Sequence, residues 1–281
     1  MSNSDLGPLK LGEILDRMFV IYRRNFLLLF GISGIPYVLL LPIVLIFIFS
    51  GPLASLNSQE PPSPETFGTI FAAIFIFMGF LLFFGLASWL ATTAAVWQIQ
   101  MGGKPTIRGV YRVAWHRSGA AFLAAIAGGA ALLAGYFMFV IPAIFVALEL
   151  CLTMEAIICE GSGAFAAMSR SRFLVSGYRR KVFVSWLVCA GVSTVMSYAV
   201  LIPPLLMLPF IIKSGTIPSW FIVILVVAYF LALTVPAPLL AIALCLIYYD
   251  ARVRKEGFDL QRLLDELPPG NVQGTPEIVA S

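Results

Sequence analysis

The sequence predicts an all-α protein, a polytopic membrane helix bundle with six transmembrane helices and amphipathic helices at the cytoplasmic membrane interface. Composition supports this fold class, because 60% of the 281 residues are hydrophobic and only 11% are charged, whereas soluble domains carry roughly 25% charged residues. The apolar runs are also long, and several reach the roughly 20 residues that one helix needs to cross a bilayer. Such a chain cannot cover its surface in water, so its main solvent is lipid.

The apolar runs place the predicted spans, in chain order, at about 26–49, 69–97, 119–140, 142–159, 183–212 and 218–249. The first run exceeds the roughly 7–15 apolar residues of a signal peptide and follows a segment with three acids, so we expect it to remain as a membrane helix. Residues 1–267 then form a single integral membrane domain, which ends in a short leucine-rich amphipathic helix. Pro268-Pro269-Gly270 stops that helix, and residues 268–281 are predicted to be a flexible tail.

The distribution of basic residues sets the predicted topology. Every Lys and Arg except Lys213 lies before span one, between spans two and three, between spans four and five, or after span six. Cytoplasmic loops retain Lys and Arg, so we expect these four segments and both termini on the cytoplasmic side of a bacterial inner membrane. The connection 50–67 contains two acids and no base, as expected for an external loop.

Span six requires a choice between two structures. Residues 218–249 are long for one helix and contain Pro236 and Pro238, each of which removes a backbone donor. A hairpin at these prolines would give seven spans and would move the basic cluster that follows to the outside, against the charge rule. We therefore favour one long, kinked or tilted helix, whose freed carbonyls are bonded by neighbouring side chains.

Three of the cytoplasmic segments share one plan, at 11–25, 105–117 and 163–181. Each has an apolar stripe at helical spacing, ends in a basic cluster and is followed at once by an apolar span. Amphipathic helices of this kind lie in the membrane interface. The chain can therefore be interpreted as three units of an interfacial helix and a two-span hairpin, at roughly 1–98, 99–160 and 161–250. The alternative is that stop-transfer charges simply precede each membrane helix.

No motif for catalysis or metal binding is present in the sequence. The chain lacks H-E-x-x-H, G-x-S-x-G and P-loop patterns, and its single histidine, His116, lies in a basic amphipathic segment. Four cysteines stand in apolar runs without C-x-x-C spacing, which is typical of small apolar packing residues. We therefore expect no catalytic residue, no metal and no cofactor.

Two acids inside span four are the candidate functional residues of the membrane interior. At 1.5 Å per residue, Glu149 would lie about 16 Å from Glu160 at the cytoplasmic edge, and Glu155 would lie between them. An acid near mid-membrane is costly and by default indicates function. Glu149 and Glu155 could therefore take part in ion or proton transport. They could instead be structural, either neutral and hydrogen-bonded or partly wet in a tilted segment.

The C-terminal stretch YYDARVRKEGFDL (248–260) resembles the Y-Y-D-x-R-x-R-x-E-G-x-D-L signature of the bacterial glycerophosphoryl diester phosphodiesterase membrane-domain family. LGEILDRMFVIYRRNF (11–26) resembles that family's N-terminal block. The segment 159–183 resembles its central E-G-x-x-x-x-A-x-x-R-S-x-x-L-x-x-G block. The matching residues are Glu160, Gly161, Ala167, Arg170, Ser171, Leu174, Gly177, Tyr248, Tyr249, Asp250, Arg252, Arg254, Glu256, Gly257, Asp259 and Leu260.

The resemblance implies the membrane topology and no phosphodiesterase activity. The family takes its name from proteins in which this membrane region is fused to a soluble phosphodiesterase barrel with His pairs and metal-binding acids. Only His116 is present here, and no soluble stretch is long enough for such a barrel. The resemblance therefore implies a stand-alone membrane region without a catalytic domain.

Three functional hypotheses remain at the level of sequence. The first is a non-catalytic inner-membrane protein that interacts with lipid or organises a protein partner. The second is a secondary transporter or channel-like protein that uses Glu149 and Glu155. The third is a membrane component accessory to glycerophospholipid metabolism. Membrane lipids are the expected partners and nucleic acid is not, and the predicted contacts with anionic lipid are Arg179, Arg180, Lys181, Arg252, Arg254 and Lys255.

Overall fold

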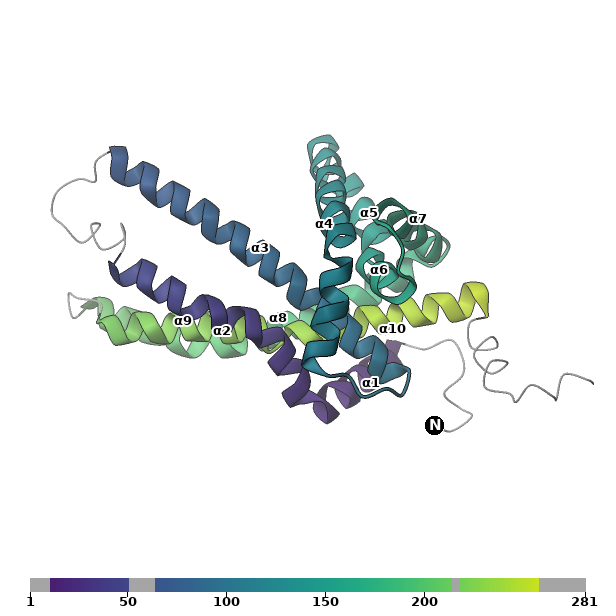
Figure 1. Cartoon of the computed structure of the whole chain (residues 1–281), viewed down its shortest axis with the longest axis horizontal. Helices are drawn as coiled ribbons and strands as arrows, with labels where there is room; N and C mark the ends of the chain where they lie inside the picture. Colours follow the sequence, from purple (N-terminus) through teal and green to yellow (C-terminus); the bar gives the residue numbers. More distant parts are fainter. Residues whose placement is uncertain (1–10, 51–63, 214–217, 258–281) are drawn as a thin grey trace, which may run out of the picture.

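The computed structural model describes residues 11–50, 64–213 and 218–257, and every regular element in these ranges is an α-helix (Figure 1). The helices are α1 (Leu11–Arg24), α2 (Phe26–Ser50), α3 (Pro64–Gln100), α4 (Ile107–Met138), α5 (Val140–Leu150), α6 (Thr153–Glu160), α7 (Ala164–Val175), α8 (Arg179–Lys213), α9 (Ser219–Thr234) and α10 (Ala237–Glu256). The predicted all-α fold is confirmed.

Six stretches of the described chain are long and apolar enough to cross a membrane. They are Phe26–Ile46, Phe67–Gln100, Ile107–Met138, Val140–Glu160, Arg179–Lys213 and Ser219–Glu256. Each of the six overlaps one predicted span, and the chain is a multi-pass membrane protein. The predicted tail, and the amphipathic helix before it, lie outside the described residues.

Helix α10 forms the centre of the molecule. It contacts α1, α3, α7 and α8, and most of its side chains are buried, with Tyr248 the largest of those that are fully enclosed. Figure 1 shows α2, α3, α8 and α9 extending together to one side of this centre, whereas α4 leaves it in a different direction. Helices α6, α7 and α10 contact one another and carry the polar side chains of the candidate site.

Span six is a single bent span, as predicted, and not a hairpin. Val235 and Pro236, which separate α9 from α10, both keep right-handed helical backbone angles, and α10 continues away from α9 in Figure 1. Pro236 has no N–H for the carbonyl of Ala232, and the Ser197 hydroxyl on α8 donates to that oxygen at 2.9 Å. The Tyr22 hydroxyl on α1 donates to the neighbouring carbonyl of Val235 at 2.8 Å. These two bonds stabilise the bend, because an unbonded carbonyl in lipid is costly.

A second carbonyl that a proline leaves without a backbone donor is bonded in the same way. Pro36 in α2 cannot donate to the carbonyl of Ile32, four residues earlier. The Tyr111 hydroxyl, from α4, donates to that oxygen at 2.7 Å. Side chains far away in the sequence thus bond backbone groups that proline leaves open.

Two sequence predictions about helix boundaries are wrong. Residues 105–117 do not form a separate interfacial helix, because α4 begins at Ile107, after the Thr106 N-cap, and continues without a break into span three. Span four, predicted as one helix over 142–159, is divided into α5 and α6 at Cys151–Leu152. Short helices do precede spans one and five, as α1 and α7. Of the three predicted units, only the first and third therefore have a separate short helix before their first span.

Candidate functional site

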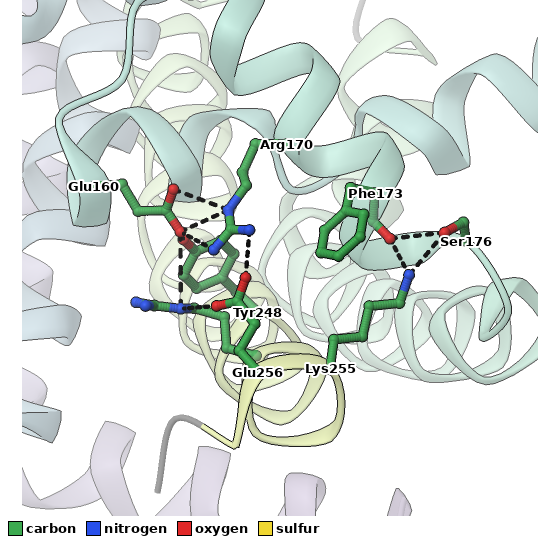
Figure 2. A network of polar contacts seen from close by, with 8 residues as sticks. Glu160, Arg170, Phe173, Ser176, Tyr248, Lys255 and Glu256 are labelled. Atoms are coloured by element: carbon green, nitrogen blue, oxygen red, sulfur yellow. Dashed lines mark hydrogen bonds and ion pairs between the residues drawn. The ribbon is translucent and has the colours of Figure 1, made fainter. Parts of the chain in front are cut away.

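Residues of the central sequence block (159–183) contact residues of the C-terminal block (248–260), and together they form one polar network (Figure 2). Glu160, at the end of α6, accepts hydrogen bonds from Arg170 Nε on α7 at 2.9 and 3.0 Å. The Tyr248 hydroxyl on α10 donates to the same carboxylate. Arg170 also pairs with Glu256, which in turn pairs with Arg252 at 3.1 Å along α10. The network therefore joins the central block to the C-terminal block.

The network balances its own charges. It contains two carboxylates and two guanidinium groups, and each of these side chains is between 15% and 23% exposed. The hydrogen bond from Arg170 to Glu256, with a further contribution from Glu160, raises the pKa of Arg170, so this guanidinium stays charged. Because every charge has a partner of opposite sign, the cluster has little net charge to offer a ligand.

A second set of polar contacts attaches the end of α10 to α7 and α8. Asp250 pairs with Lys181 at 2.5 Å and with Arg254, one helical turn later on α10, at 3.0 Å. Lys255 bonds the Ser176 hydroxyl at 2.7 Å and the carbonyl of Phe173 (Figure 2). The basic residues of the C-terminal block therefore hold neighbouring helices in place.

Two glycines of the blocks end helices in the left-handed conformation, which favours glycine. Gly161 follows α6 with φ +70° and Gly257 follows α10 with φ +60°. Arg117 Nη1 donates to the carbonyl of Gly161 at 2.7 Å, and a Cβ at Gly161 would lie only 2.5 Å from this guanidinium. Tyr249 is buried, whereas Asp259 and Leu260 lie outside the described residues.

Ser171 holds the break in span four. Its hydroxyl donates to the carbonyl of Glu149 at 2.6 Å and accepts from the N–H of Leu152 at 3.2 Å. These backbone groups lie on either side of the break, and the fully buried Ser171 bonds both. Ser171, on α7, thus links the backbone on the two sides of the break between α5 and α6.

Glu149 is not an isolated acid of the membrane interior. Its carboxylate pairs with Arg179 at the start of α8, at 2.5 Å, and lies 3.8 Å from Arg172 on α7. The side chain is 26% exposed. The expected separation of about 16 Å from Glu160 assumed one straight helix, whereas the break at Cys151–Leu152 changes the direction of the chain before Glu149 is reached. Glu149 therefore belongs to the charged region at the start of α8.

Glu155 differs from Glu149 in both burial and polar partners. It is fully buried in α6, and within the described chain neither carboxyl oxygen has a hydrogen-bond partner. The buried hydroxyl of Thr153, at the start of the same helix, also has no partner among these residues. Cys151 and Cys159 stand four residues before and after Glu155. Of the two predicted acids, this is the one whose environment is unusual for a purely structural residue.

The predicted lipid-contacting residues divide into two groups. Arg179, Lys181, Arg252, Arg254 and Lys255 all have polar partners inside the chain. Arg180 is exposed, and its side chain has no polar partner in the described part of the protein. Whether any of the six contacts lipid stays a prediction. Arg180 is the one of them that is both exposed and without a polar partner in the described residues.

Other exposed cations share the environment of Arg180, and in the sequence they served to predict the topology and the amphipathic segments. Each is exposed and has no side-chain partner within the ranges that the structure describes. They are Arg23, Arg24, Lys104, Arg108, Arg112 and, at the other end of α8, Lys213. An absence of acids at helical spacing does not by itself identify them, because Arg179 and Lys181 lack such acids too and pair with acids on other helices.

No group of three or more His, Cys, Asp or Glu side chains that could hold a metal occurs among residues 11–50, 64–213 and 218–257. His116 is exposed on α4.

Comparisons with protein-family models, with curated proteins and with solved structures find no match to this chain.

Proposed function

We propose that this chain is a non-catalytic protein of the bacterial cytoplasmic membrane, related to the glycerophosphoryl diester phosphodiesterase membrane-domain family, and that it interacts with anionic lipid. The observation that carries this proposal is a set of exposed arginines at the starts of three spans, each without a side-chain partner in the described chain. Arg23 and Arg24 precede α2, Arg108 and Arg112 open α4, and Arg180 opens α8.

The topology supports a common membrane surface for these arginines. The spans that begin with α2, α4 and α8 are the first, third and fifth, so their starts lie on the same side of the membrane. Each basic residue near an anionic bilayer surface contributes roughly 1 kcal/mol of attraction, and salt screens this attraction over a distance of about 8 Å. A set of such residues on one side favours an anionic leaflet.

The polar network supports a structural role for the signature residues. Glu160, Arg170 and Glu256 direct their charged atoms at one another (Figure 2). A catalytic site needs a nucleophile or base with room for substrate beside it. We therefore propose that this part of the chain holds the membrane domain together and carries out no hydrolysis.

Native mass spectrometry of the protein, extracted in mild detergent, tests this proposal. The account predicts retained anionic phospholipid in excess of its share in the source membrane, with retention that falls as salt rises. Retained lipid that matches the bulk composition at every salt concentration would contradict the lipid interaction. Hydrolysis of a glycerophosphodiester by the purified protein, lost in a variant of the polar network, would contradict the non-catalytic assignment.

The proposed orientation places both termini in the cytoplasm. It rests on the distribution of basic residues, which are concentrated at the starts of spans one, three and five and at the end of span six. A reporter enzyme that is active only in the cytoplasm should be active when fused after Arg262. Activity of a periplasm-specific reporter at the same position would contradict this orientation.

Coupled transport is the second candidate, and Glu155 is the observation that favours it. A buried carboxyl without a partner in the described chain, next to a break in a span, is an arrangement that transporters use. Replacement by glutamine keeps the shape and hydrogen-bonding capacity without the acid. If the chain transports ions or protons, Glu155→Gln should abolish proton or cation flux in proteoliposomes while the protein remains folded. Equal flux in the wild type and the variant would remove this candidate's best residue.

A further inference from the structure

An apolar groove lies between α4, α5 and α8, separate from the polar network. Its cavity volume is about 580 Å³, within the roughly 300–1,000 Å³ of sites that bind small molecules. α4 and α5 line it with Gly128, Gly129 and Leu148, and α8 contributes Phe183 and Trp186. Residues of α3, α6, α7 and α10, among them Trp89, Met168 and Leu244, complete the lining.

The lining of the groove fits a hydrocarbon chain. Two consecutive glycines on α4 leave room at the wall, and a Cβ placed on Gly129 would meet no heavy atom within 4 Å. The other lining residues are almost all aliphatic or aromatic. The hydroxyl of Thr153 is an exception, because it belongs to a lining residue, is buried and has no partner within the described chain.

One end of the groove carries excess positive charge. Phe183 lines the groove, and Arg179 and Arg180 precede it by one helical turn on α8. Glu149, between the lining residues Leu148 and Leu150, pairs with both Arg179 and Arg172. One carboxylate therefore faces two guanidinium groups, and the exposed Arg180 adds a further positive charge. The groove thus combines an apolar body with a cationic end.

We infer that this groove binds one acyl chain of an anionic phospholipid, whose phosphate lies among Arg172, Arg179 and Arg180. The acyl chain would lie against Gly129, Phe183 and Trp186. The inference rests on the proposed lipid interaction and names its site and its ligand class. A phospholipid is the occupant that matches both parts, because its acyl chain is apolar and its phosphate is a strong acceptor for arginine.

Fluorescence quenching by brominated lipids tests this site, because Trp186 lies in the groove. The protein is reconstituted in phosphatidylcholine vesicles that contain a small fraction of phosphatidylglycerol or phosphatidylcholine brominated on one acyl chain. Trp186→Phe identifies the part of the signal that comes from Trp186, and Trp89, which also lines the groove, is present in both proteins. We expect brominated phosphatidylglycerol to quench this part several-fold more strongly than brominated phosphatidylcholine.

Two glycine variants test the apolar body of the groove. Gly129→Leu should fill the groove and remove the preference for phosphatidylglycerol at Trp186, and its Cβ would meet no heavy atom within 4 Å. Gly191→Leu is the matched control, since Gly191 is exposed on α8, also has open space beyond it and does not line the groove. It should keep the preference. An unchanged preference in Gly129→Leu would overturn the inference.

Two arginine variants test the cationic end. Each neutralised arginine should lower the preference about fivefold, the factor that corresponds to roughly 1 kcal/mol per basic residue. Arg172→Gln with Arg180→Gln should therefore lose it, whereas the control Arg108→Gln with Arg112→Gln should retain it. Equal loss in both pairs would overturn the site. After such a result, native mass spectrometry of the wild-type protein separates the two proposals. Retained anionic lipid would mean that only this site fails, and no retained anionic lipid would mean that the proposed function fails as well.

Discussion

The last turns of α10 and the first turns of α4 look alike in sequence but differ in structure. Both segments carry several cations beside an apolar span. In α10, Arg252, Arg254 and Lys255 bond acids, a hydroxyl or a carbonyl of the same chain. In α4, Arg108 and Arg112 are exposed, and no side-chain partner for them lies within the described ranges.

The difference shows that a basic cluster at a membrane boundary can have either of two roles. Where acids stand at helical spacing or on a facing helix, the cations hold the fold together. Where acids are absent, the cations remain exposed, and these are the cations that we propose contact lipid. The positive-inside rule counts both groups equally, so it predicts orientation but cannot separate these roles.

The largest difference in stability between the two clusters is expected from Glu160→Gln. The change leaves Arg170 and Arg252 without one carboxylate and weakens the bond from Tyr248, and we expect it to lower the free energy of unfolding by about 2–3 kcal/mol. The control is Arg112→Gln, an exposed position where a change within about 0.5 kcal/mol is expected. Reversible unfolding in mixed micelles would measure both, and equal effects would refute the distinction between the two clusters.

Ser171→Ala should have the next largest effect. Its hydroxyl bonds backbone groups on both sides of the break between α5 and α6, and its loss leaves them unbonded, at a cost of about 1–2 kcal/mol. Ser118→Ala is the control, because that hydroxyl bonds only the carbonyl of Trp115 in its own helix. An unfolding free energy for Ser171→Ala equal to that of the control would mean that the break needs no support from α7.

Tyr111→Phe should have a smaller effect that depends on Pro36. The loss of the bond to the carbonyl of Ile32 should lower the unfolding free energy by about 1 kcal/mol. In a Pro36→Ala background, the substituted residue would supply a backbone N–H to that carbonyl, so the same change should cost much less. A double-mutant cycle measures this coupling, and a coupling energy of zero would mean that Tyr111 does not compensate for the proline.

The sequence predicted the helical fold and the six spans, because long apolar runs are local signals, and it predicted the single sixth span from the distribution of basic residues. It missed the break at Cys151–Leu152, since no proline or glycine marks it and the support comes from Ser171, on another helix. For the same reason it misplaced Glu149, whose partners lie on other helices.

The polar network could be predicted only in part. The sequence blocks around Glu160 and around Tyr248 were recognised separately, but their contact depends on how α6, α7 and α10 meet. The exposure of Arg108 and Arg112 likewise depends on which helix faces are covered. Spacing along one helix is readable from the sequence, whereas pairing between helices requires the arrangement in space.

The central claim is that α10 uses its cations for the fold and that α4 presents its cations to lipid. Native mass spectrometry at several salt concentrations tests it most directly, by comparing Arg108→Gln with Arg112→Gln against the single variant Arg252→Gln. The account predicts that the α4 pair retains less anionic lipid, with a weaker salt dependence, while stability is unchanged. It predicts that Arg252→Gln is less stable but retains wild-type lipid when folded. The reverse pattern, with lipid lost only in Arg252→Gln, would contradict the account.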